Sequence, residues 1–212
     1  MKDIPLFITE FGTASLALQQ IPYRQSAYIR LHTTPTPEQL LVECVSFCRA
    51  CGARNIFATG DAFLEKYPLD DIVMRFTCAK ERLPLADAAL FPVLPETLAQ
   101  WQQIYNKKMS GVIHAAYMDK QEAQALLYSG EGYFIHREGV LLGIGKASAG
   151  KIDALAATAP HCGKAVLLAL ATLTQDGAIC LEVSKSNRKA IGLYEALGFL
   201  PVGEVVRWYR IS

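Results

Sequence analysis

The stretch Cys180–Phe199 carries side chains that could do chemistry: a carboxylate at Glu182, a carboxamide at Asn187 and a phenol at Tyr194. A phenol has a reference pKa of about 10, so it can donate a proton or a hydrogen bond at neutral pH. Tyr194 also shares an apolar helical repeat with Ile191, and this pattern alone is more typical of a core residue.

The same stretch predicts a strand, a short polar turn and an amphipathic helix. The strand is Ile179–Val183, and Ser184 or Ser186 is expected to cap the helix by accepting from its first-turn N–H groups. Gly198 is placed to adopt the left-handed conformation that closes the helix, with Phe199 folding back onto it. These elements predict a β-α unit of an α/β domain.

A second candidate for chemistry is the turn between a predicted strand, Lys151–Ala159, and a predicted helix, Ala165–Thr174. A helix N-terminus offers unpaired N–H donors and a positive dipole end, and a glycine such as Gly163 lets phosphate approach. Lys164 would add a cation. A strand-to-helix turn with one glycine is common, however, so this turn alone indicates phosphate binding only weakly.

The spacing L-x-V, then Asn187, then A-I-x-L-Y-E-x-L-G-F over residues 190–199 resembles the C-terminal signature of the Gcn5-related N-acetyltransferases (GNAT). That family transfers an acyl group from acyl-coenzyme A, usually to an amine. The resemblance implies that Asn187 lies beside the pantetheine arm and that Tyr194 directs its hydroxyl at the thioester sulfur. It implies an N-acetyltransferase that uses acetyl-CoA as co-substrate and no metal, with direct attack of the amine in a ternary complex.

The family's phosphate turn has the form [QR]-x-x-G-x-[GA], which Gly163 and Ala165 match, whereas Pro160 stands where glutamine or arginine is usual. A second register, from Thr158 to Lys164 with a one-residue deletion, fits as well, and both place the N–H groups of about 162–166 at the pyrophosphate. The residues expected to contact the coenzyme are Ala157, Thr158, Cys162, Gly163, Lys164, Ala165, Val166, Asn187 and Tyr194. The altered turn favours an alternative, an acyl-CoA-binding pseudoenzyme that acts as a sensor or scaffold. A third option is an assembly subunit that binds no ligand.

An N-acetyltransferase must also remove a proton from its amine. Glu182 is the best candidate base, because it interrupts a central apolar strand, and Asp153 on the preceding strand is the second. His114 and His136 remain further candidates, and deprotonation through water would need no base at all.

The composition of the chain limits the kinds of binding partner that we expect. The chain has 212 residues, with 21 basic and 20 acidic side chains and a net charge of +1, so nothing suggests a nucleic acid or another polyanion. The N-terminus, with Asp3 and Glu10, does not read as a signal peptide, and no apolar stretch approaches the span of a bilayer. Six scattered cysteines suit free thiols in the cytoplasm. We expect a cytoplasmic protein with a small-molecule or peptide amine as acceptor, and a homodimer is one option for its assembly.

From residue 85 onward the predicted order of elements is β-α-α-β-β-β-α-β-α-β, which is the topology of the family. The expected fold is therefore α/β (α+β), a mixed central sheet flanked by helices. The charged residues Lys80–Arg82 and the prolines around them place a boundary near residue 85, which gives an N-terminal segment 1–84 and an acetyltransferase domain 85–212.

A hairpin is predicted within this domain, with strands Tyr133–Arg137 and Val140–Ala147 around a tight turn at Glu138 and Gly139. Gly143 and Gly145 weaken the second strand unless a backbone or a ligand must approach it closely.

The N-terminal segment repeats part of this order. A short helix is predicted around Thr13–Gln20, followed by strand Ala27–Leu31, helix Thr36–Cys51 and strand Asn55–Thr59. We interpret it as a degenerate, shortened copy of the acyltransferase core. Its turn, His32–Pro37, has no glycine and two prolines that lack an N–H, so it should hold no coenzyme. The alternative is that any two β-α-β segments look alike.

Cys44, Cys48 and Cys51 recur at helical spacing and could suggest a metal site. They share their face with apolar residues such as Leu40 and have no fourth ligand nearby, so buried structural thiols are the preferred interpretation.

Overall fold

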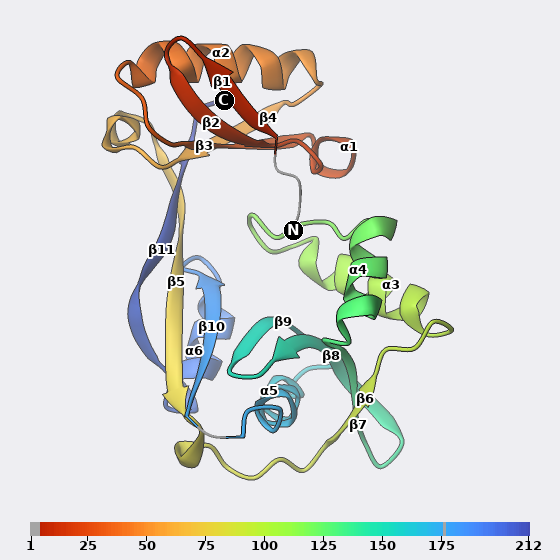
Figure 1. Cartoon of the computed structure of the whole chain (residues 1–212). Coiled ribbons are helices and arrows are strands. Elements are labelled where there is room, and N and C mark those ends of the chain that lie inside the picture. The colour runs from red at the N-terminus through yellow and green to blue at the C-terminus, as the bar shows by residue number, and fades with distance from the viewer. Residues whose placement is uncertain (1–4, 176) are drawn as a thin grey trace. The chain divides into compact units, whose positions relative to one another are not determined.

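The computed structural model describes residues 5–175 and 177–212, and the chain forms two compact units (Figure 1). Unit 1 takes the chain up to Ile72 together with Val206–Ser212, and unit 2 takes Val73–Val205. The long strands β5 (Leu69–Ala79) and β11 (Leu200–Arg210) each contribute residues to both units. The predicted boundary near residue 85 differs from this division, because β5 runs without interruption through Ile72 and Val73 and the charged segment after it belongs to unit 2.

Unit 1 is a mixed sheet in the order β1-β2-β3-β4-β11. Its first three strands are antiparallel, β3 and β4 are parallel, and the end of β11 is antiparallel to β4. The bounds are β1 (Leu6–Thr9), β2 (Gly12–Ala17), α1 (Ile21–Arg24), β3 (Ser26–Leu31), α2 (Pro37–Ala50), β4 (Asn55–Thr59) and the 3-10 helix η1 (Ala62–Lys66).

The core of unit 1 lies between α2 and the sheet. Ala14 and Leu16 alternate with less buried residues on β2, a period of two that belongs to a strand. The helix predicted around Thr13–Gln20 is therefore wrong. Cys44 and Cys48 are buried in this core as predicted, and burial raises their thiol pKa values to about 12 and about 11. Cys51, in contrast, lies exposed at the C-terminus of α2.

Unit 2 is a sheet in the order β11-β5-β10-β9-β8-β7-β6, with β9 and β10 as its parallel pair. The bounds are η2 (Lys80–Arg82), β6 (Ala89–Pro92), α3 (Leu98–Met109), α4 (Lys120–Ser129), β7 (Gly132–Arg137), β8 (Val140–Ser148), β9 (Lys151–Ala157), α5 (Gly163–Ala171), β10 (Ala178–Ser184) and α6 (Arg188–Ala196). The predicted order β-α-α-β-β-β-α-β-α-β is confirmed. Among the described residues, no helix has the length and apolar character needed to cross a bilayer.

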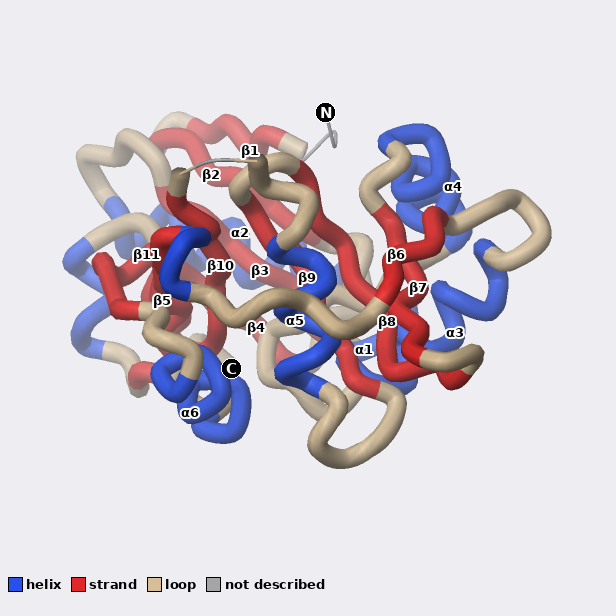
Figure 2. Tube along the Cα trace, turned by 90° about the horizontal axis from the view of Figure 1, so that it is seen from below, coloured by secondary structure: helices blue, strands red, loops and turns tan. Residues whose placement is uncertain are grey.

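Helices cover both faces of the unit 2 sheet. Phe134 and Ile135 are neighbours on β7, so their side chains point to opposite faces. Ile135 packs in a core with α5 and α6, and Phe134 packs in a second core with Trp101 of α3 and Leu126 of α4. Figure 2 shows α5 lying against β9.

The glycines of β8 allow α5 to approach this closely. A Cβ on Gly143 would lie 2.5 Å from the carbonyl oxygen of Ala156 and 2.6 Å from Cγ2 of Val166. A Cβ on Gly145 would lie 2.4 Å from Cδ1 of Leu170. The prediction that other groups approach this strand closely is confirmed. They are the backbone of β9 at Gly143 and side chains of α5 at both glycines.

The turn that joins β7 to β8 is also as predicted. Glu138 and Gly139 both have positive φ, 52° and 79°. This is the combination that a two-residue hairpin turn requires, because it matches the twist of the two strands.

Candidate functional site

The parallel strands β9 and β10 separate soon after they meet. Each has seven residues, but they are paired only at Cys180 with Lys151 and at Leu181 with Ile152. Beyond these positions β9 continues to Ala157, and there it is paired with β8 but not with β10. Beyond Ile152, the main-chain groups of β9 on its β10 side therefore have no partner strand among the described residues, and an extended ligand could pair with them.

The turn after β9 leads into a helix without a side-chain cap. Cys162 is the N-cap residue of α5, and the first intrahelical hydrogen bond runs from Val166 N to Cys162 O at 3.0 Å. The N–H groups of Gly163, Lys164 and Ala165 have no partner in the part of the chain that the structure describes. Three free donors at the positive end of a helix dipole make a place for an anion.

The side chains of this turn differ in their availability. The Thr158 hydroxyl donates to the carbonyl of Leu141 at 2.7 Å, so it is committed to β8. Ala165 and Val166 are buried, so only their main chain could contact a ligand, whereas Lys164 is exposed. The structure adds a cation that the sequence analysis missed, because Lys108 of α3 donates to the carbonyl of Thr158 at 3.2 Å.

Helix α6 packs against the start of α5. A Cβ on Gly163 would lie only 3.1 Å from Cδ2 of Leu193, the residue before Tyr194. Asn187 caps α6, because its Oδ1 accepts from Ala190 N at 3.2 Å. The predicted cap by Ser184 or Ser186 is wrong, since these two hydroxyls hydrogen-bond to each other at 2.6 Å.

The end of α6 is as predicted. Gly198 closes it with a φ of 86°, and the fully buried Phe199 donates its N–H to the carbonyl of Tyr194 at 3.0 Å.

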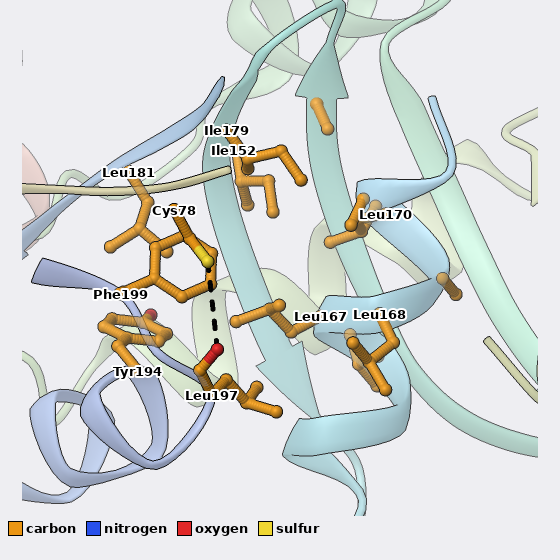
Figure 3. Packing of buried hydrophobic residues seen from close by; sticks show 14 of the residues in the cluster. Cys78, Ile152, Leu167, Leu168, Leu170, Ile179, Leu181, Tyr194, Leu197 and Phe199 are labelled. Atoms are coloured by element: carbon orange, nitrogen blue, oxygen red, sulfur yellow. Dashed lines mark hydrogen bonds between the residues drawn. The ribbon is translucent and has the colours of Figure 1, made fainter. Parts of the chain in front are cut away.

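Tyr194 lies on the inner face of α6, beside Phe199 (Figure 3). Its ring centroid is 6.0 Å from that of Phe199 and 6.4 Å from that of Phe76. Its side chain is 8% exposed, and its hydroxyl has no hydrogen-bond partner among the described residues. Burial raises the pKa of Tyr194 to about 12. The phenol is therefore protonated at neutral pH, and its hydrogen-bonding capacity is unused.

Glu182 lies on the other face of the sheet, because its neighbours Leu181 and Val183 are buried on the face of α5 and α6. It is the first residue of β10 beyond the last position paired with β9. Its Oε1 accepts from Nη2 of Arg75 at 2.8 Å and from Nε of Arg75 at 3.3 Å. Sequence reasoning missed Arg75, which lies in β5, upstream of the segment that resembles the family.

The other candidate bases are less well placed. Burial tends to raise the pKa of Asp153, but the hydrogen bond from Lys151 and the nearby charge of Lys146 outweigh it, so the pKa lies below its usual range. His136 is on β7, which β8 and β9 separate from β10, and His114 lies in the loop between α3 and α4. Within the described chain, no group of three or more His, Cys, Asp or Glu side chains is arranged to hold a metal ion.

Sequence comparison finds no matching family model and no matching curated protein. Solved structures do match. A GCN5-related N-acetyltransferase from Kribbella flavida is similar over 99% of this chain and 90% of its own, with a TM-score of 0.61 and 15% identity. One from Sphaerobacter thermophilus covers 95% of this chain and 77% of its own, with a TM-score of 0.58 and 12% identity.

A tandem GNAT protein from the clavulanic acid biosynthesis pathway is similar over 93% of this chain and 78% of its own, with a TM-score of 0.56 and 14% identity. These likenesses agree with the fold class predicted from the sequence and with the mixed sheet and its flanking helices. The chain has the fold of the Gcn5-related N-acetyltransferases.

Proposed function

We propose that the protein is an acyl-CoA-dependent N-acetyltransferase whose site lies in unit 2. The observation that carries this proposal is the early separation of β9 and β10 beside the uncapped start of α5. One feature offers unpaired main-chain groups along an extended strand, and the other offers a cluster of donors for an anion. A coenzyme with amides in its arm and a pyrophosphate at its far end needs both.

The residues present fit such a coenzyme. The free N–H groups of Gly163, Lys164 and Ala165 would bind the pyrophosphate, with the ammonium groups of Lys164 and Lys108 nearby. The β10 side of β9 would pair with the amides of the pantetheine arm. The side-chain amide nitrogen of Asn187 has no partner among the described residues and could donate to the same arm.

The bound thioester would supply the activated acetyl group, and side chains on opposite faces of the sheet would handle the protons. Tyr194, protonated at neutral pH, would donate to the departing sulfur. Glu182, on the other face, would accept the proton that the attacking amine loses. In a direct attack the tetrahedral intermediate carries both the amine nitrogen and the leaving sulfur on the carbonyl carbon, so separate groups can take the proton from nitrogen and give one to sulfur. The acceptor would be a small-molecule or peptide amine.

A second candidate is an acyl-CoA-binding pseudoenzyme that acts as a sensor or scaffold. Two observations favour it: Pro160 brings no N–H donor to the phosphate turn, and the Glu182 carboxylate already pairs with Arg75.

Calorimetry with acetyl-CoA, combined with an assay of thiol release in the presence of varied amines, separates these two functions. An acetyltransferase should bind one acetyl-CoA per chain and release coenzyme A only when an amine is present. The pseudoenzyme should bind acetyl-CoA with the same stoichiometry and release none. Absence of binding at millimolar acetyl-CoA would refute both.

A further inference from the structure

An ion pair joins β5 and β10 on the face of the unit 2 sheet opposite α5 and α6. Arg75 and Glu182 are register partners on these antiparallel strands, while the adjacent Phe76 and Leu181 are buried on the other face. Because Leu181 is the last residue of β10 paired with β9, Glu182 stands where the two parallel strands begin to separate. The pair therefore lies at the proposed acetyl-transfer site, on the side from which an amine would approach.

The hydrogen bonding within this pair is incomplete. Both Nη2 and Nε of Arg75 donate to the same oxygen, Oε1 of Glu182. Oε2 of Glu182 and Nη1 of Arg75 have no partner among the described residues. The nearby Asp153 differs, because its Oδ1 pairs with Lys151 at 2.8 Å and its Oδ2 with Lys146 at 3.3 Å. The side chains of Arg75 and Glu182 are 50% and 31% exposed, so a ligand can reach their free atoms.

We propose that Arg75 and Glu182 form the acceptor site and that the acceptor is a free α-amino acid. This inference rests on the acetyltransferase function proposed above. The free edge of the guanidinium would bind the α-carboxylate, whose planar geometry matches it. The α-amino group would donate to Oε2 of Glu182. A simple amine, or the N-terminus of a peptide, lacks the adjacent carboxylate and would use only the second contact.

The transfer balances without a further reactant. The α-ammonium gives one proton to Oε2 of Glu182, which passes it to water. The nitrogen lone pair then forms a bond to the acetyl carbon, and the carbon–sulfur bond breaks with its electron pair on sulfur. Nitrogen loses a second proton to the same oxygen of Glu182, and sulfur receives a proton from the Tyr194 hydroxyl, which water replenishes. The products are the N-acetylamino acid, the coenzyme thiol and one proton.

Matched acceptor pairs test this inference: phenylalanine with phenethylamine, tyrosine with tyramine, tryptophan with tryptamine and histidine with histamine. Each amine differs from its amino acid only by the lost carboxylate, and thiol release from acetyl-CoA gives kcat and KM for each. The full-length chain is compared with Arg75→Gln and Arg75→Lys. Arg137→Gln serves as the matched control, because it removes a similar ion pair, Arg137 with Asp87 at 2.6 Å, on β7.

We expect the wild-type protein to prefer at least one amino acid over its amine, and Arg75→Gln to lower kcat/KM for that amino acid by about 10- to 100-fold, the effect of one charged hydrogen-bond partner. The loss should appear mainly in KM, because Arg75 holds the acceptor and takes no part in proton transfer. Arg75→Lys should recover part of it, since lysine keeps the charge and loses the planar fork. Because Arg75 also pairs with Glu182, the substitution should lower kcat/KM less for the matched amine than for the amino acid, and the ratio of the two values is the readout. The affinity of Arg75→Gln for acetyl-CoA and the kinetics of Arg137→Gln should match those of the wild type.

Two results would overturn the inference. Equal or better use of the amines would refute the amino-acid acceptor and leave the acetyltransferase function standing. If no acceptor is turned over, calorimetry with the amino acids on the coenzyme A-loaded protein decides. Binding that Arg75→Gln abolishes would support the acceptor site while refuting the enzymatic function, and no binding of any amino acid would refute the site.

Discussion

The two units contain the same strand–helix–strand arrangement, but the two parallel strands separate only in unit 2. In unit 1, β3 and β4 flank α2 and stay paired from Ser26 with Asn55 to Arg30 with Thr59. In unit 2, β9 and β10 flank α5 and separate after Leu181. The antiparallel strands on both sides of the parallel pair occupy the same positions in the two sheets. This common order supports our proposal that unit 1 is a shortened copy of the acyltransferase core.

The turn between β3 and α2 differs from the turn between β9 and α5 in its hydrogen bonding. In unit 1 the Thr34 hydroxyl donates to the carbonyl of Phe11 at 2.6 Å and accepts from Thr36 N at 3.2 Å, while Pro35 and Pro37 have no N–H. Among the described residues, α2 therefore has two unpaired N–H groups in its first turn, those of Glu38 and Gln39, whereas α5 has three.

The strand ends of unit 1 are also close together. A Cβ on Gly60, just after β4, would lie 2.2 Å from the carbonyl oxygen of Leu31, the last residue of β3. A strand–helix–strand arrangement therefore does not by itself make a coenzyme site. Separated strands are needed as well as unpaired donors. In unit 1 β3 and β4 stay paired, although the N–H groups of Glu38 and Gln39 in α2 have no partner among the described residues.

We expect the largest effect from removing the hydroxyl of Tyr194. This residue lies on α6, which follows β10 in unit 2, whereas in unit 1 β4 is followed by the five-residue 3-10 helix η1. Tyr194→Phe should lower kcat by about 10- to 1000-fold and leave acetyl-CoA affinity nearly unchanged, since the hydroxyl acts on charge that develops in the transition state. Steady-state thiol release measures it, with Tyr67→Phe in unit 1 as control. Full activity of Tyr194→Phe would make Tyr194 a core residue only.

Removing one donor should make the turn of unit 2 more like that of unit 1. Gly163→Pro deletes the N–H of the first residue of α5, and it should weaken acetyl-CoA binding by about 10- to 100-fold. Gly163→Ala keeps the N–H and adds the same Cβ near Leu193, so it isolates the steric effect. Acetyl-pantetheine, which has no pyrophosphate, should bind both variants equally in calorimetry. Equal affinity of both variants for acetyl-CoA would place the pyrophosphate elsewhere.

The two units also differ in the strand that lies next to the parallel pair. In unit 2 helix α5 packs on Gly143 and Gly145 of β8, whereas in unit 1 the corresponding strand, β2, buries Ala14 and Leu16 in the core. Gly143→Ala should lower the free energy of unfolding by about 1–3 kcal/mol, because its Cβ would meet the main-chain oxygen of Ala156. Gly145→Ala should cost less, since its Cβ would meet only the movable end of Leu170. Urea unfolding of both variants checks the order, and the reverse ranking would contradict the proposed contact.

The smallest expected effect is a pH dependence of stability that comes from the buried phenol of unit 2. Below pH 10 Tyr194 is protonated in both the folded and the unfolded chain. Between pH 10 and about 12 the unfolded phenol ionises while the folded one stays neutral, so its contribution to stability falls as the pH rises through this range. The melting temperature of the wild type relative to Tyr194→Phe should therefore decline from pH 10 upward. A constant difference would show that the phenol is not shielded from water.

Much of this contrast could be predicted from local sequence. The element order from residue 85, the left-handed Gly198 and the turn at Glu138 and Gly139 all follow from periodicity and turn chemistry, which act over a few residues. The absence of glycine and the two prolines in His32–Pro37 likewise indicated a turn with few donors. The helix predicted around Thr13–Gln20 failed because pairing between β1, β2 and β3 overrides a weak local preference.

Long-range pairing decided the rest. Arg75 and Glu182 are 107 residues apart in sequence and meet only because β5 pairs with β10. The shared roles of β5 and β11 in the two units, and the point at which β9 leaves β10, depend in the same way on register between distant strands. Composition and spacing identify a strand, but its neighbours come from contacts spread over the whole chain. The sequence therefore determined which residues could do chemistry, and the tertiary structure decided which of them lie where β9 and β10 separate.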